Sequence, residues 1–196
     1  MAWAKLGSVT LGSAGDNLSS GTISANTFLS TIAYLEDNGS AINGILNFNN
    51  DTGTNYARRR SANGGSASTS TSTQYPELYS YGAAHPFFSR IFIINISSEE
   101  KLVIVHSVGQ NTAGASNAPN RWEAVIKWSN TSAQITEIDI DNTEAGSYDT
   151  ESNISVIGSE MTPAAAQDLT VTDGAIFYET DTNKEFLLSN NIWTEL

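Results

Sequence analysis

Hydrophobic and polar residues alternate along several short segments of this chain. The clearest is residues 121–128 (RWEAVIKW), where Trp122 and Ile126 alternate with charged neighbours. A period of two is typical of an antiparallel strand with one buried face. Similar segments at residues 2–11 and 45–48 are separated by polar turns. The pattern predicts an antiparallel all-β domain of about eight strands, arranged as a sandwich.

Residues 28–35 (FLSTIAYL) allow two interpretations. Phe28, Ile32 and Leu35 would share one face of a helix, whereas every second residue from Phe28 would share one face of a strand. Thr, Ile and Tyr favour strands, and residues 37–39 (DNG) follow as a hairpin-type turn. We therefore predict a strand that turns back on itself after residue 36.

Two segments are hydrophobic at consecutive positions as well as at alternate ones. They are residues 87–96 (FFSRIFIINI) and 102–108 (LVIVHSV), and a polar turn at residues 97–100 predicts that they form a hairpin. Strands with this pattern are apolar on both faces. We expect them either to lie inside the sandwich with both faces covered or to face another subunit.

Residues 61–86 contain mostly Ser, Thr, Ala and Gly, followed by Tyr75, Tyr79 and Tyr81. We expect an irregular loop over this range. Ordered loops of such length are uncommon and are usually functional or interfacial. The loop and its tyrosines are therefore candidates for contact with a partner.

The composition changes after residue 158. We expect a β-sandwich over residues 1–158, a linker over residues 159–170 and a small β module over residues 171–196, built as a hairpin or meander. Three short strands bury little hydrophobic surface on their own. The module therefore needs the main domain or a partner to cover its aromatic residues.

Charge and composition narrow the classes of partner. The chain has 196 residues, no cysteine and a formal net charge of −12. Residues 1–136 hold as many bases as acids, whereas residues 137–196 hold thirteen acids against Lys184 alone. This acidity disfavours nucleic acid and anionic membranes as partners. The absence of cysteine excludes disulfides and thiolate metal sites, and the short apolar runs predict neither a signal peptide nor membrane insertion.

Residues 46–65 (LNFNNDTGTNYARRRSANGG) concentrate residues with special conformational or chemical roles. Asp51 and Asn55 place oxygen ligands at alternate positions around a glycine. This spacing fits a calcium loop, although it does not match the full EF-hand pattern, and it equally fits a simple turn. In the second interpretation the turn aims Tyr56 and the arginines that follow at a partner. We expect no cofactor, and calcium at Asp51 and Asn55 is the alternative.

Three consecutive arginines follow this turn. They are either a locally paired cluster or a docking point for an acidic partner, such as the C-terminal part of a neighbouring copy. The candidate assembly interface consists of Arg58, Arg59, Arg60, Tyr56, Tyr75, Tyr79 and Tyr81.

Catalysis has little support in this sequence. The two histidines, His85 and His106, belong to no nucleophile or metal motif. We expect both to have structural roles and the protein not to be an enzyme. Aromatic faces stack on sugar rings, so a glycan-binding interpretation also stays open. It rests on Tyr75, Tyr79, Tyr81 and Trp122.

Several motifs resemble those of structural proteins from tailed bacteriophages and related marine viruses. They are the opening Trp-x-x-Leu-Gly-Ser from Trp3, the stretch FNNDTGTNYARRRSANGG, the EAVIKW strand and the IxVIGS that begins at Ile154. The C-terminal GAIFYETDTNKEFLLSNNIWTEL is similar to the strand-turn-strand units that often end phage tail and fibre proteins. Together these motifs cover most of the chain.

The resemblance implies a non-enzymatic virion structural protein with a jelly-roll-like sandwich, acting as head decoration, tail, fibre or spike. Such proteins are often trimers, so it favours a homotrimer that also docks on other virion proteins. It implies a location in the extracellular particle after assembly in the host cytoplasm. The alternative is a tip protein that binds a receptor or a host-surface glycan during host attachment.

Overall fold

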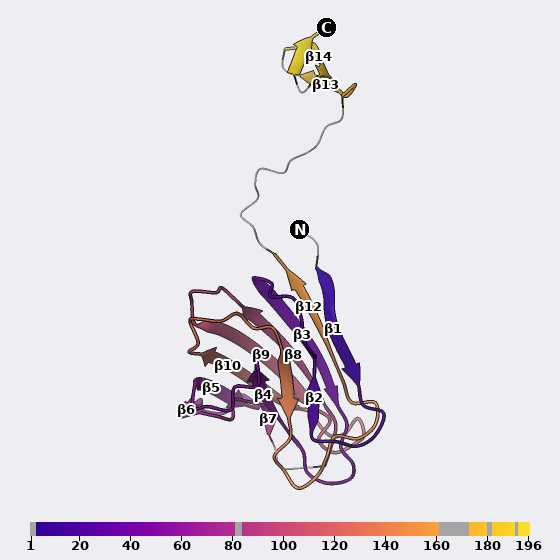
Figure 1. Cartoon of the computed structure of the whole chain (residues 1–196). Coiled ribbons are helices and arrows are strands. Elements are labelled where there is room, and N and C mark those ends of the chain that lie inside the picture. Colours follow the sequence, from indigo (N-terminus) through magenta and orange to yellow (C-terminus); the bar gives the residue numbers. More distant parts are fainter. Residues whose placement is uncertain (1–2, 81–83, 161–172, 180–181, 191) are drawn as a thin grey trace. The chain divides into compact units, whose positions relative to one another are not determined.

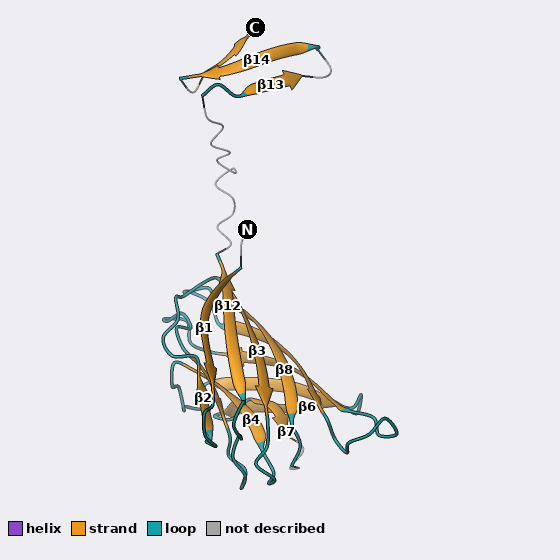
Figure 2. Cartoon of the chain, turned by 90° about the vertical axis from the view of Figure 1, so that its right-hand side faces the viewer, coloured by secondary structure: helices purple, strands orange, loops and turns teal. Residues whose placement is uncertain are grey.

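The computed structural model describes residues 3–80, 84–160, 173–179, 182–190 and 192–196. The chain divides into two compact units, Met1–Met161 and Thr162–Leu196. Every regular element in the described ranges is a β-strand, which confirms the predicted all-β fold (Figure 2). Within these ranges there is accordingly no helix long and apolar enough to cross a membrane.

The first unit is a sandwich of two antiparallel sheets (Figure 1). The larger sheet contains, in spatial order, β1 (Ala4–Thr10), β12 (Asn153–Ser159), β3 (Phe28–Leu35), β8 (Phe87–Ile94), β9 (Lys101–Gly109), β10 (Asn120–Trp128), β5 (Tyr56–Ala62) and β6 (Ser68–Thr73). The smaller sheet contains β2 (Asn17–Ser19), β11 (Ile138–Asp141), β4 (Asn43–Phe48) and β7 (Glu77–Ser80). The predicted sandwich is confirmed. Its strand order is compatible with a jelly roll, and that finer assignment stays a prediction.

The core lies between the two sheets. In β8, β9 and β10 alternate residues are buried, because the strands are pleated and only one set faces the smaller sheet. Three aromatic rings fill one part of this core. The Trp128 ring lies 5.7 Å from that of Phe48 and stacks on Tyr56 at 6.4 Å between centroids.

The strand predicted at residues 28–35 is confirmed as β3. The hairpin predicted after it is wrong, because β3 pairs with β12 and β8 while the next strand, β4, belongs to the other sheet. Residues 37–39 do form a local turn, in which the Gly39 amide donates to Asp37 Oδ1 at 2.9 Å. That turn carries the chain between sheets.

The irregular loop predicted at residues 61–86 is also wrong, because it contains strands β6 and β7. Asn63 and Gly64 have φ values of 50° and 74°. Positive φ at both central residues is the signature of a type I′ turn, which joins antiparallel strands directly. The chain therefore returns as β6 beside β5, and the Ser/Thr run forms an edge strand instead of a loop.

The second unit is a three-stranded antiparallel meander of β13 (Ile176–Glu179), β14 (Lys184–Ser189) and β15 (Ile192–Glu195), which confirms the three predicted strands. The ring centroid of Phe177 lies 6.2 Å from that of Phe186 and 6.1 Å from that of Trp193. This cluster forms one face of the meander.

The acidic part of the sequence does not coincide with the second unit. Seven of the thirteen acids after residue 136 lie before residue 161 and belong to the sandwich. The sandwich is therefore acidic overall, and its charge is distributed by face and not by sequence position.

Candidate functional site

The arginine triplet lies on strand β5, where alternation divides it. Arg58 and Arg60 point to the interior, whereas Arg59 points outward. Arg58 is only 7% exposed and forms an ion pair with Glu77 of strand β7. Arg60 Nε lies 3.5 Å from the same carboxylate, and its guanidinium lies 4.1 Å from the centre of the Trp122 ring. These two arginines join the two sheets at the edge of the sandwich, which leaves Arg59 as the exposed member.

The predicted interface tyrosines are also divided. Tyr56 and Tyr79 are buried in the core, where Tyr56 Oη accepts a hydrogen bond from the Phe48 amide at 3.0 Å. Tyr79 stacks on Phe87 with 4.6 Å between the ring centroids. Tyr75 is exposed, and Tyr81 lies outside the described residues. Among the predicted interface residues that are described, only Tyr75 and Arg59 are fully exposed to a partner.

The Asp51 turn has its carboxylate oxygens occupied by donors from the chain. Asp51 accepts from the Gly53 amide at 2.9 Å and from Trp128 Nε1 at 2.6 Å, and Asn55 Nδ2 donates to both of its carboxylate oxygens at 3.0 and 2.9 Å. Partial burial opposes ionisation, but the hydrogen bonds from Trp128, Asn55 and Gly53 outweigh it and lower the pKa of Asp51. This arrangement favours the structural-turn interpretation over the calcium one.

The rest of the described chain offers no better candidate for a metal site. Across the part of the chain that the structure describes, no group of three or more His, Asp or Glu residues is placed to hold a metal ion. His85 is buried and hydrogen-bonded to Tyr79, and burial lowers its pKa. His106 is exposed on strand β9. Trp122 is buried, so of the aromatic residues that suggested glycan binding only Tyr75 is described as exposed.

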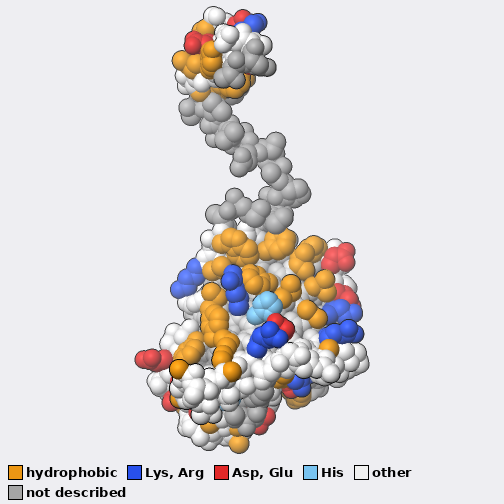
Figure 3. Space-filling model, turned by 180° about the vertical axis from the view of Figure 1, so that it is seen from behind, with side chains coloured by type: hydrophobic (Ala, Val, Ile, Leu, Met, Phe, Trp, Pro, Cys, Tyr) orange, Lys and Arg blue, Asp and Glu red, His pale blue; other side chains and the backbone are white. Residues whose placement is uncertain are grey.

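The outward side of the eight-stranded sheet is the largest feature that the core does not explain. Leu102, Ile104 and Val125 are 55%, 50% and 52% exposed in the middle of this side. Figure 3 shows hydrophobic side chains gathered over it, with basic side chains among them. We call this surface the outer face. Its exposed or partly exposed hydrophobic members are Phe28, Ile32, Tyr34, Phe88, Phe92, Ile94, Leu102, Ile104, Val108, Val125 and Ile157.

Strand register arranges these residues in rows across the sheet. Phe92, Ile104 and Val125 are directly opposite one another on β8, β9 and β10. Directly opposed side chains on one face of a sheet lie about 5 Å apart between Cβ atoms. The rows therefore form a continuous apolar surface and not isolated exposed residues.

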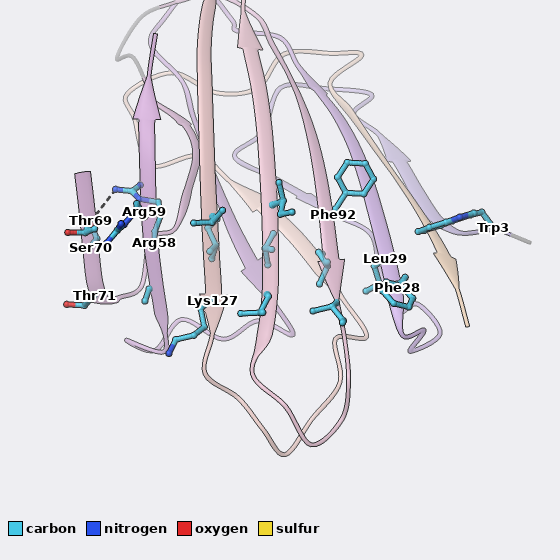
Figure 4. A pocket seen from close by; sticks show the side chains of 18 residues that line it. Trp3, Phe28, Leu29, Arg58, Arg59, Thr69, Ser70, Thr71, Phe92 and Lys127 are labelled. Carbon is cyan, nitrogen blue, oxygen red and sulfur yellow. Dashed lines mark hydrogen bonds between the residues drawn. The ribbon is translucent and has the colours of Figure 1, made fainter. Parts of the chain in front are cut away.

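An open groove of about 690 Å³ runs across part of the outer face. Leu102, Ile104 and Val125 form its floor, and Figure 4 shows Phe28 and Phe92 towards one end and Arg59 with β6 towards the other. Its lining is mostly hydrocarbon with a basic rim. Such a groove fits an apolar occupant better than a sugar or a metal ion.

Charged residues on the outer face are few and are mostly basic. Along the eight strands, outward positions carry Lys5, Arg59, Arg90, Arg121 and Lys127, with Glu123 as the acid. Lys127 pairs with Glu100 of the adjoining turn at 2.9 Å, and Arg121 lies 3.8 Å from Glu123. Arg90 has no ion pair within the described ranges, and its guanidinium lies 4.5 Å from the Phe92 ring centre.

The sequence signal for this surface was the consecutive hydrophobic pattern of residues 87–96 and 102–108. The predicted hairpin of these segments is confirmed, since β8 pairs with β9. One face of each strand contributes to the core, and the other stays uncovered in the described chain. Within the described residues of the sandwich the outer side of this hairpin is not covered, and contact with another subunit stays a prediction.

No protein-family model matches the chain, and comparisons with curated proteins and with solved structures return no similar protein.

Proposed function

We propose that this chain is a non-enzymatic structural protein that assembles through the outer face of its eight-stranded sheet. In agreement with its sequence motifs, we further propose that it is a component of a virus particle. The observation that carries the proposal is the continuous row of apolar side chains across β8, β9 and β10, in which Phe92 is partly exposed and Ile104 and Val125 are about half exposed.

The hydrophobic effect supplies the driving force. Exposed apolar area costs roughly 25 cal/mol per Å² relative to burial. Contiguous apolar patches on monomers are rarely larger than a few hundred Å², and larger ones usually mark interaction sites. Covering Leu102, Ile104 and Val125 at the same time requires an extended apolar partner surface. A second copy of the chain offers such a surface.

The form of the surface favours a two-fold arrangement. A cyclic trimer joins two different patches on each subunit, whereas a single patch meets itself only around a two-fold axis. The outer face is one patch. We therefore propose a pair of sandwiches as the basic assembly unit, and the trimer implied by the sequence motifs requires a further contact.

The test is the mass of the full chain in solution, measured by light scattering coupled to size-exclusion chromatography at about 10 μM, in the range of micromolar affinities. We expect a dimer. Ile104→Glu places a charge in the centre of the apolar row and should give a monomer with unchanged unfolding. The control, Ser8→Glu, adds the same charge at the outer edge of the sheet and should stay dimeric. A monomeric wild-type chain at this concentration would overturn the proposal.

The proposed place in a particle has its own test. Antibody labelling and cryo-EM of purified particles, produced in a host that expresses the encoding genome, should locate the protein on the particle. Its absence from every particle component would remove the virion role and leave the assembly role to be decided by the mass measurement.

A further inference from the structure

The outer face contains one polar row between its apolar rows. Register places Arg90 of β8, His106 of β9 and Glu123 of β10 directly opposite one another. The row on one side, Phe92, Ile104 and Val125, is apolar on the same three strands, and the row on the other side consists of Phe88, Val108 and Arg121. Arg90 and Glu123 therefore lie on opposite sides of β9, and each is one strand away from it.

We propose that two copies of the chain pack with their outer faces together around a two-fold axis that runs along β9, so that Arg90 of each copy pairs with Glu123 of the other. This inference rests on the proposed assembly function. It adds to that proposal the alignment of the two sheets and the residues that determine this alignment.

Two kinds of two-fold axis keep the strands of the two copies aligned: one runs along the strands and the other runs across them. The charges favour the axis along the strands. A two-fold axis across the strands would place Arg90 against Arg90 and Glu123 against Glu123. An axis along β9 exchanges the strands on its two sides, so each base meets an acid. Like charges that face each other across an interface oppose association, whereas opposite charges fix the register. Sheets packed face to face also keep their strands nearly aligned, as this axis requires.

The same rotation determines the other contacts of the surface. Leu102, Ile104 and His106 lie on the axis and meet their own counterparts, and Lys127 faces Ile94 of the second copy. Phe92 of one copy faces Val125 of the other, which places a large side chain over a short one in the groove floor. Arg121 faces Phe88 of the second copy, an arrangement in which a guanidinium can lie over an aromatic ring.

The experiment exchanges the charges in the full chain. Arg90→Glu and Glu123→Arg should each weaken the dimer about a hundredfold, because every dimer contains the altered contact twice. The double variant R90E/E123R should recover the wild-type dimer, since the pair is restored with its signs reversed. Dissociation constants from analytical ultracentrifugation measure each effect.

Mixing the two single variants gives a sharper result. A heterodimer of R90E and E123R has opposite charges at both contacts, while each homodimer has like charges. Native mass spectrometry, with one variant labelled with ¹⁵N, should therefore show mainly the mixed dimer. A statistical mixture of species would overturn the register.

Two controls separate the possible failures. Lys5→Glu and Glu144→Arg reverse charges of the same kinds away from the polar row and should leave the dimer unchanged. A dimeric wild type whose affinity is insensitive to Arg90→Glu would overturn this inference but keep the assembly proposal. A monomeric wild type would overturn both.

Discussion

The two sheets of the sandwich have outward sides of opposite chemistry. On the four-stranded sheet, Ser19, Asp139 and Asn47 form a polar row that faces away from the other sheet, and Asp139 and Asn47 are buried there. Leu18, Ile140 and Leu46 form the inward row. On the eight-stranded sheet both sides of β8, β9 and β10 are largely apolar. Because the two sheets belong to one chain, overall composition does not explain the difference. An outward apolar surface is a property of one sheet only, as expected for an interface.

The largest change in the free energy of unfolding should distinguish the two sides of the eight-stranded sheet. Ile91 is fully buried in the core, whereas Ile104 on the neighbouring strand is half exposed. Ile91→Ala should lower the free energy of unfolding by about 3 kcal/mol, because it removes buried methyl groups and leaves a cavity. Ile104→Ala should change it by less than about 0.5 kcal/mol in the monomer. Urea unfolding at low protein concentration measures both, and equal losses would show that the outer face is covered within the chain.

The second comparison concerns the divided arginine triplet. Glu77→Gln removes the negative partner of Arg58, which stays buried with an uncompensated charge. We expect a loss of about 2–3 kcal/mol, since Glu77 is partly exposed and solvent reduces the penalty. Arg59→Gln, on the outward side of the same strand, should change the free energy of unfolding by less than about 0.5 kcal/mol. If both substitutions were neutral, the Arg58–Glu77 contact would not hold the two sheets together.

A substitution in the Asp51 turn should give the next largest loss in the free energy of unfolding. Asp51→Asn replaces a carboxylate that accepts from Trp128, Asn55 and Gly53, and we expect a loss of about 2 kcal/mol at pH 7. The pKa of Asp51 is lower in the fold than its ordinary value of 3.8. Its stabilisation is therefore present above pH 3.8 and is lost as the pH falls through the lowered value.

The measurement is urea unfolding of wild type and D51N across this pH range. The difference between the two should be constant from neutral pH down to about pH 4 and should then narrow. A difference that does not depend on pH would mean that the charge of Asp51 contributes nothing to the turn.

The smallest effect should be a gain in stability, from a substitution in the four-stranded sheet. Burial raises the pKa of Asp139, and its Oδ2 atom and Asn47 Oδ1 are buried without a hydrogen-bond partner in the described ranges. Asp139→Asn removes the buried charge and supplies an amide donor beside Asn47. We expect the variant to melt at a higher temperature than wild type at pH 7.

The pH dependence of this gain checks its cause. Wild type loses stability as the pH rises from 3.8 through the raised pKa of Asp139, because the unfolded chain ionises first. The advantage of D139N should therefore be complete at neutral pH and absent below pH 3.8. A variant less stable than wild type at pH 7 would show that the hydrogen bonds of the carboxylate outweigh its desolvation.

Local pattern was sufficient for the strands with clear alternation. Residues 121–128 formed a strand with Trp122 and Ile126 inward, and residues 28–35 matched their predicted strand. Strand β6 was missed because a Ser/Thr run carries no hydrophobic period, although Asn63-Gly64 was a local hairpin signal. Strand β7 was missed because its four residues are too few to show a period. Pairing is a long-range property, which is why the turn at residues 37–39 did not reveal a change of sheet.

Less of the candidate site could be predicted from the sequence. Once residues 56–62 are known to be a strand, alternation alone separates Arg59 from its neighbours, but the stretch was interpreted as turn and loop. The contact of Asp51 with Trp128 spans 77 positions in the chain, and no local pattern encodes it. The polar row of Arg90, His106 and Glu123 exists only through strand register, which single-strand periodicity does not determine.

The two edges of the eight-stranded sheet limit how far assembly can go. Edge strand β6 consists of Ser and Thr, its pairing with β5 is interrupted by a bulge, and Ser72 has a φ of 51°. The opposite edge, β1, also has a bulge, next to Lys5. Irregular, polar or lysine-bearing edges resist the addition of further strands. The edges therefore suppress amyloid-like growth of the sheet, even in a chain that exposes an apolar sheet face at high concentration.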